Sequence, residues 1–375
     1  MRSVQELLDL LHGAAANPRS QMEAYAAAGK QVVLTAPVYT PEEVIHSMGL
    51  VPMGAWGGDV QLNESKRYFP AFICSIAQSI VELGIAGAYR GAKAIVIPAL
   101  CDSLKVLIEN FKYGVPAIPV VPMIWPQNRV PDFGKAFTRA GCERVIRDLE
   151  AITGAAYSDE ALRGSIRVYN AHNAAMRRLS AVLAVHPEVG AAARSDCFKS
   201  AFFLLKEEHT ALITELCDAL EAQGTAETEK TPVYISGILA DSPAFNALLD
   251  EAGLYVAGDD VAAQSRQYRT DAPEDCPAPL DALAEKFARM NHCSVLYDPE
   301  KRRVGFIADE AKALGAKGVL LVLTKFCDPE EFDNPLIARA CQAAGLPATV
   351  IEIDRQMVNY EQARTAIETF KDMLS

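Results

Sequence analysis

Two widely separated stretches of this sequence follow one plan. Residues 91–102 (GAKAIVIPALCD) and 315–328 (GAKGVLLVLTKFCD) both carry an apolar run after Gly-Ala-Lys and end on Cys-Asp. Residues 32–52 and 232–256 likewise share the order strand, loop, helix, Gly-Leu and strand. Apolar runs without alternation are typical of parallel strands that are buried on both faces. The sequence therefore predicts an α/β protein with two doubly wound parallel-sheet domains of the Rossmann or flavodoxin type.

The two halves could also look alike only because all strand–helix–strand segments do, but the matching cysteines at both strand ends favour a duplication. Residues 135–222 contain almost no strand signal, and the polar stretch at 223–231 (QGTAETEKT) predicts a linker. We therefore expect four parts: an N-terminal helical arm at 1–30, a first α/β domain at 31–134, a helical connecting segment with its linker at 135–230, and a second α/β domain at 231–375.

The chain is acidic, with a formal net charge of −12. It lacks the basic stripe that displaces counterions from nucleic acid, and its charge gives no attraction to anionic membranes. Its most apolar runs fall short of the ~20 residues of a membrane helix, and its mixed-charge start does not resemble a secretory signal. The sequence contains neither GxxxxGK[ST] nor a GxGxxG after a strand, which argues against ATP hydrolysis and nicotinamide binding. We expect a cytoplasmic protein.

Nine cysteines are scattered through the chain and are expected to be reduced thiols. Cys101 and Cys327 lie where a predicted strand ends and a helix begins, which is where open α/β sheets bind ligands. For Cys327 the helix start is strongly marked, with Asp328 as the expected N-cap and Pro329 at the first helical position. Cys74 opens another predicted helix, which should run from about Ser75 to Tyr89. A helix N-terminus stabilises a thiolate, which makes these thiols better metal ligands, although neighbouring aspartates oppose the effect.

The remaining cysteines and histidines are interpreted as structural. Cys293 is a weaker ligand candidate, because it precedes the second Gly-Ala-Lys strand somewhat as Cys74 precedes the first. His209 follows two glutamates and is expected to be solvated or paired on a polar helix face. The other cysteines are expected in the core or in positions without ligand character: Cys142, Cys197, Cys217, Cys276 and Cys341.

Three motifs around the first three cysteines resemble the 2-hydroxyacyl-CoA dehydratase family, the superfamily of the 2-hydroxyglutaryl-CoA dehydratase D-component and benzoyl-CoA reductase. They are FPAFICSI at 69–76, PALCDSL at 98–104 and KFCDPEE at 325–331. The likeness covers nearly the whole chain, including PVYTPEE at 37–43 and EID at 352–354. It looks most like the smaller, beta-type subunit.

The resemblance implies that Cys74, Cys101 and Cys327 are the metal ligands of a [4Fe–4S] cluster and leave one iron without a protein cysteine. It implies an oxygen-sensitive lyase of amino acid fermentation that converts an (R)-2-hydroxyacyl-CoA to a 2-enoyl-CoA through a ketyl radical. The implied partners are an alpha-type subunit, which would hold most of the acyl-CoA in a heterodimer, and a transient ATP-dependent iron–sulfur activator.

Catalytic residues cannot be assigned from the motifs, but five residues are candidates for supporting the cluster: Tyr39, Glu42, Trp56, Gly57 and Gly58. The glycine pair would equally suit a tight turn. Two other functions stay open at this point. One is a benzoyl-CoA reductase-type or double-cubane-cluster reductase subunit, and the other is a non-catalytic electron-transfer subunit.

Overall fold

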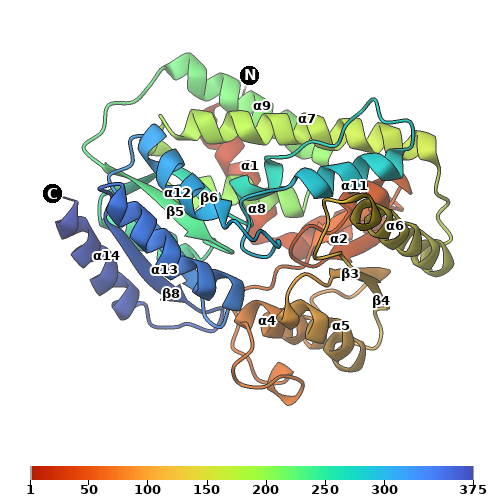
Figure 1. Cartoon of the computed structure of the whole chain (residues 1–375). Helices are drawn as coiled ribbons and strands as arrows, with labels where there is room; N and C mark the ends of the chain where they lie inside the picture. The colour runs from red at the N-terminus through yellow and green to blue at the C-terminus, as the bar shows by residue number, and fades with distance from the viewer. Residues whose placement is uncertain (1, 375) are drawn as a thin grey trace.

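Two four-stranded sheets, each entirely parallel, form the framework of the chain in a computed structural model that describes residues 2–374 (Figure 1). The strand order is β2-β1-β3-β4 in the first sheet and β6-β5-β7-β8 in the second. The prediction of two doubly wound parallel sheets on one plan is confirmed. The strands are β1 (Val32–Thr35), β2 (Val51–Gly54), β3 (Ala94–Pro98), β4 (Val120–Met123), β5 (Thr231–Gly237), β6 (Leu254–Val261), β7 (Val319–Thr324) and β8 (Ala348–Ile353).

Helices flank both sheets and fill the segment between them (Figure 1). They are α1 (Val4–Ala16), α2 (Pro18–Ala27), α3 (Glu42–Ser47), α4 (Ser75–Ile85), α5 (Asp102–Gly114), α6 (Asp132–Thr153), α7 (Asp159–Leu183), α8 (Gly190–Lys199), α9 (Lys206–Gln223), α10 (Pro243–Glu251), α11 (Pro279–Arg289), α12 (Arg302–Ala313), α13 (Asp328–Ala343) and α14 (Glu361–Met373). Short 3-10 turns include η3 (Ser200–Phe202) and η4 (Ser265–Tyr268).

The two sheets correspond strand for strand. In the first, β1 pairs with β3 in the register Val33–Ala94, and in the second, β5 pairs with β7 in the register Tyr234–Val319. In each sheet the connections turn in opposite directions on either side of this central pair. Such a switch point leaves a crevice at the carboxyl ends of the strands, where ligands of open α/β sheets bind. Strands β3 and β7 each end three residues before a cysteine, Cys101 and Cys327.

The long helix α7 connects the two halves. It begins after Ser158, whose hydroxyl accepts a hydrogen bond from the backbone N–H of Ala161 at 3.2 Å, as the sequence predicts. Along its length α7 contacts α3 of the first half and β6 of the second. The N-terminal helix α1 buries Leu7 and Leu11 in a cluster with side chains of α7, α8 and α9. The apolar face of the arm is therefore covered by the helical segment.

Two local predictions are wrong. The helix after Cys74 was expected to reach Tyr89 but ends at Ile85, and the chain soon turns through Gly87 at a positive φ of 82°. The N-cap of α13 is Cys327 itself rather than Asp328, because Cys327 already has a non-helical backbone with φ −90° and ψ 82°. The second difference places the sulfur, and not the carboxylate, at the free N–H groups of the helix.

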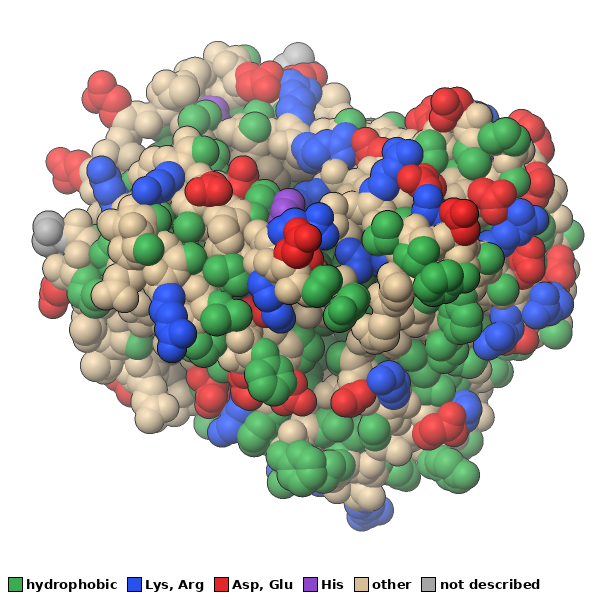
Figure 2. All heavy atoms as spheres, in the orientation of Figure 1, with side chains coloured by type: hydrophobic (Ala, Val, Ile, Leu, Met, Phe, Trp, Pro, Cys, Tyr) green, Lys and Arg blue, Asp and Glu red, His purple; other side chains and the backbone are tan. Residues whose placement is uncertain are grey.

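The surface agrees with the acidic, mixed composition. On the face in Figure 2, acidic and basic side chains are interspersed and form no basic stripe. Within residues 2–374, no helix combines the length and the apolar content that crossing a bilayer requires.

Candidate functional site

Three cysteines occupy equivalent positions at the starts of three helices. Cys74 is the N-cap of α4, Cys101 of α5 and Cys327 of α13. Cys74 and Cys327 are buried, and Cys101 is partly exposed. Each sulfur accepts hydrogen bonds from backbone N–H groups in the first turn of its own helix. The donors are Ile76 and Ala77 for Cys74, Ser103 and Leu104 for Cys101, and Glu330 for Cys327.

The three thiols lie close enough to influence one another electrostatically. Burial raises the pKa of each thiol, and that of Cys101 to about 12. Negative charge on Cys74 further raises the pKa of Cys101 and of Cys327, and charge on Cys101 also raises that of Cys327. All three are free thiols. Three buried sulfurs that repel one another as thiolates become a favourable set of ligands when a cation lies among them.

The chemistry of this set is compatible with an iron–sulfur cluster. Among residues 2–374, no three His, Cys, Asp or Glu side chains are arranged to hold one metal ion. The ligands of an iron–sulfur cube attach to different irons and so stand farther apart than the ligands of one zinc. Three thiols at helix starts, with N–H groups directed at their sulfurs, are the donors that such a cube uses.

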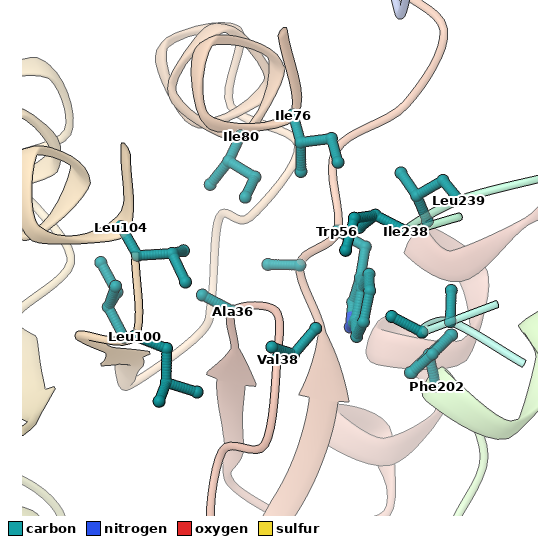
Figure 3. Packing of buried hydrophobic residues seen from close by; sticks show 14 of the residues in the cluster. Ala36, Val38, Trp56, Ile76, Ile80, Leu100, Leu104, Phe202, Ile238 and Leu239 are labelled. Atoms are coloured by element: carbon teal, nitrogen blue, oxygen red, sulfur yellow. The ribbon is translucent and has the colours of Figure 1, made fainter. Parts of the chain in front are cut away.

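Apolar side chains surround the region of the first two cysteines. Figure 3 shows Ile76 of α4 and the neighbours of Cys101, Leu100 and Leu104, with Val38 and Trp56 below and beside them. All five are buried. The low polarity excludes water from the sulfurs and strengthens the electrostatic effect of any charge placed nearby.

Gly57 allows the segment after β2 to lie against α4. It has a positive φ of 74°, and a Cβ built on it would lie 2.0 Å from the Ser79 hydroxyl oxygen. The indole of Trp56 packs on Phe202 with ring centroids 4.9 Å apart. A Cβ at Gly58 would only touch Leu83 at 3.6 Å. Gly57 thus fixes the position of the helix that Cys74 caps, Trp56 packs against η3, and Gly58 has an ordinary environment.

The other two supporting candidates lie in a cavity between the halves of the chain. The Glu42 carboxylate accepts a hydrogen bond from Thr35 at 3.2 Å and forms an ion pair with Lys206 at 3.0 Å. Tyr39 is partly buried beside Cys293, and the loss of solvent, followed by that neighbour, raises the pKa of its phenol. The Cys293 sulfur itself lies 3.6 Å from an Arg266 Nη1 donor. The contacts of Cys293 are thus with a guanidinium and a phenol.

The sequence did not identify Arg355, which lies beside Cys74. Its backbone N–H donates to Ser75 Oγ at 3.2 Å, and its buried guanidinium pairs with Asp59 and Asp241. Its Nε has no hydrogen-bond partner among the described residues. Burial raises the pKa of Cys74, and the Arg355 cation acts in the opposite direction. The EID motif that directly precedes Arg355 was a signal that could have found it.

A second missed feature is a buried ionic network behind Cys327. Glu330, in the first turn of α13, accepts from Arg303 at 2.7 Å and from Arg266 at 3.3 Å. Arg303 also reaches Asp260 at 2.8 Å and Asp333 at 3.1 Å. All of these side chains are buried. The network fixes the helix start that presents Cys327 and the N–H group of Glu330.

Comparison with known proteins agrees over almost the entire length. The family model described as 2-hydroxyglutaryl-CoA dehydratase, D-component, matches residues 37–374. The chain is 41% identical to the (R)-phenyllactyl-CoA dehydratase beta subunit of Clostridium sporogenes over 92% of each chain. It is 34% identical to lactoyl-CoA dehydratase subunit beta of Anaerotignum propionicum over all of both chains. It is also 34% identical to the beta subunit of (R)-2-hydroxyglutaryl-CoA dehydratase from Acidaminococcus fermentans, over 99% of this chain and all of that one.

Proposed function

Because this chain belongs to the 2-hydroxyglutaryl-CoA dehydratase D-component family, we propose that it is the beta-type subunit of an oxygen-sensitive (R)-2-hydroxyacyl-CoA dehydratase. The enzyme is a hydro-lyase that removes water from its substrate. The specific proposal is that Cys74, Cys101 and Cys327 hold a [4Fe–4S] cluster. The observation that carries it is the convergence of three thiols from both halves of the chain into one electrostatic neighbourhood.

A bound cluster of this kind supplies low-potential electron chemistry to the enzyme. The residues of this chain stabilise the thiolates, exclude water and supply positive charge at the site. The first-turn N–H groups of α4, α5 and α13 stabilise thiolate sulfur, and the apolar side chains around Leu100 exclude water. Arg355 supplies a buried positive charge beside Cys74, which partly offsets the negative charge of three thiolates.

The reaction explains why such a group is needed. The β-proton of a 2-hydroxyacyl-CoA is not acidified by a neighbouring carbonyl, so simple base-catalysed elimination is slow. One electron placed on the thioester makes a ketyl radical anion that expels hydroxide. The β-proton of the resulting enoxy radical is then acidic enough to be lost, and the electron is returned after the proton has left. We assign the thioester mainly to an alpha-type partner chain. A separate ATP-dependent activator would provide the energy, since this chain has no nucleotide-binding motif.

Iron and sulfide analysis after anaerobic purification tests the ligand set. We expect about four irons per chain in the wild type, because a [4Fe–4S] cluster holds four. Cys74→Ala, Cys101→Ala and Cys327→Ala should each lose most of that iron. Cys217→Ala is the matched control, since Cys217 is also a free, buried cysteine but lies on α9 in the helical core.

Two outcomes would overturn the proposal. One is a wild-type chain without iron, and the other is full iron in any of the three variants. A content of about eight irons shared with a second copy would instead favour the double-cubane reductase alternative.

A further inference from the structure

A second site lies away from the three cysteines, in a cavity of about 70 Å³ between the two halves of the chain. Its walls come from the loop after β1, from the region after β4, and from α7, η4 and α11. Trp125 and Phe287 stack on one side with ring centroids 3.9 Å apart. A single water needs about 10–15 Å³, so the cavity suits a molecule of about five or six non-hydrogen atoms. Its walls are mostly apolar and aromatic.

The charged groups at the cavity cancel one another. Glu42 pairs with Lys206 at 3.0 Å, and Glu43 pairs with Lys286 at 2.5 Å. Neither lysine is left to neutralise a bound carboxylate or phosphate, and burying an unpaired charge is costly. The occupant is therefore expected to be uncharged.

One nitrogen of a histidine that lines the cavity, His172 Nδ1, needs a hydrogen-bond donor, as the contacts of His172 and His209 show. His209 Nε2 lies 3.1 Å from the carbonyl oxygen of Cys197, which can only accept, and 3.0 Å from the Ser200 hydroxyl, which donates its own proton to the same carbonyl. The proton of His209 is therefore on Nε2. His209 Nδ1 then accepts from His172 Nε2 at 2.9 Å. Burial lowers the pKa of both imidazoles, that of His209 to about 3, so both are neutral near pH 7. This arrangement leaves His172 Nδ1 as a bare acceptor.

Three unpartnered polar atoms belong to residues that line this one cavity. His172 is fully buried, and its Nδ1 has no hydrogen-bond partner among the described residues. The same holds for two donors, Trp125 Nε1 and Gln267 Nε2. Buried polar atoms are nearly always paired, so three exceptions around one cavity indicate an occupant that completes them. A hydroxyl group next to a carbonyl oxygen supplies the one donor and two acceptor positions that these atoms need, and the cavity of about 70 Å³ has room for more than the single water that would also supply them.

We propose that this cavity binds a small, uncharged 2-hydroxy carbonyl compound, with its hydroxyl donated to His172 Nδ1 and its carbonyl oxygen accepting from Gln267 and Trp125. The apolar walls surround its carbon skeleton. The site belongs to this chain itself and is additional to the thioester site assigned to the partner. It does not depend on the iron–sulfur cluster, although the ligand class matches the head group of the substrates of the proposed function.

Two isosteric amides test the site on the purified full-length protein. Lactamide carries the hydroxyl and the carbonyl, and isobutyramide replaces the hydroxyl by a methyl group. Binding is measured by saturation-transfer NMR and calorimetry, and iron content is measured on the same samples. We expect lactamide to bind at least about tenfold more tightly, because an acceptor built to receive a hydroxyl rejects the analogue that lacks it. Charged lactate should bind more weakly than lactamide.

The variants separate the roles of the lining residues. His172→Phe should abolish the preference for lactamide, whereas His12→Phe, at a histidine whose side chain is 67% exposed, should keep it. Gln267→Leu should weaken the binding of both amides and preserve the preference for lactamide. This variant keeps the proposal testable if His172→Phe, at a fully buried position, fails to fold. Equal binding of the two amides, or no binding because only water occupies the cavity, would overturn the proposal. Amide binding without iron would leave this site standing and contradict the cluster instead.

Discussion

The guanidinium of Arg355 lies 2.9 Å from the carboxylate of Asp241, and this largely buried ion pair links the carboxyl ends of two strands of the second sheet. Arg355 follows β8 and Asp241 follows β5. The same guanidinium reaches Asp59, after β2, at 3.1 Å, and the Arg355 backbone holds Ser75 at the start of α4. Arg355 therefore connects the helix capped by Cys74 to the half that contributes Cys327.

Replacing this arginine should change both stability and redox behaviour. Arg355→Met leaves Asp241 with only Lys199 at 3.1 Å, and breaking a buried pair typically costs about 3–5 kcal/mol. The free energy of unfolding should fall by about that amount in anaerobic urea titrations. The reduction potential of the proposed cluster should also shift to more negative values, because a positive charge beside it is lost. An EPR-monitored redox titration measures that shift.

Two further variants separate charge from geometry. Arg355→Lys keeps the positive charge but loses the planar guanidinium group that pairs with two carboxylates. The reduction potential of the proposed cluster should therefore stay near the wild-type value, while the free energy of unfolding falls. Arg364→Met removes an arginine whose pair with Glu251 is largely exposed, and it should change neither quantity appreciably. An unchanged potential in Arg355→Met would show that the residue acts only in folding.

Close packing at Gly57 provides a second test. In Gly57→Ala the new methyl would meet Ser79 Oγ at 2.0 Å on a backbone with positive φ, so α4 must move away. We expect a loss of at least about 2 kcal/mol of stability and reduced iron content, because Cys74 moves with the helix. Gly58→Ala is the neighbouring control, since its methyl meets Leu83 at an ordinary 3.6 Å. Similar iron content and melting temperature in both variants would contradict this explanation.

The network behind Cys327 gives a third prediction. Arg303 contacts three buried carboxylates, those of Asp260, Glu330 and Asp333. Arg303→Met should lower the free energy of unfolding by about 3–5 kcal/mol, because three buried carboxylates lose their shared partner and keep only Arg266, Arg269 and Lys301. The side chain of the adjacent Arg302 is half exposed where it pairs with Asp298, so Arg302→Met should cost much less stability than Arg303→Met. Chemical denaturation of the two variants side by side measures the difference, and equal losses would count against the network.

The parts of this structure that follow from local pattern could be predicted from the sequence. A buried apolar run followed by a helix start places Cys101 and Cys327 at strand ends whatever the rest of the chain does. The duplicated sheets followed from the repeated order of strands and helices. Cys74 needed the family motif, because its spacing to the other two cysteines fits no local ligand pattern.

Features that depend on distant pairings could not be predicted in this way. Arg355 and Asp241 are 114 residues apart, and nothing near either residue indicates its partner. His209 was expected to be solvated or paired on a polar face because two glutamates precede it. It is paired, but it is fully buried, because α9 packs that position against His172 of α7. Which side of a helix is covered is decided by its neighbours in space as well as by its own sequence.

The burial of His209 makes stability depend on pH in a defined direction. Burial lowers its pKa to about 3, below the value of about 6.5 expected in the unfolded chain. Below pH 6.5 the unfolded state therefore binds a proton that the folded state refuses, so stability is full above that pH and is lost as the pH falls towards 3. The contribution of this residue alone should amount to about 2 kcal/mol lost at pH 5.

Urea unfolding of wild type and His209→Gln at pH 7.5 and pH 5 measures this contribution. The variant keeps an N–H donor for the Cys197 carbonyl and should lose less stability on acidification, whereas His12→Gln should keep the wild-type dependence. Parallel pH dependences in wild type and His209→Gln would mean that His209 is protonated in the folded protein, and the neutral imidazole pair inferred at the cavity would then be wrong.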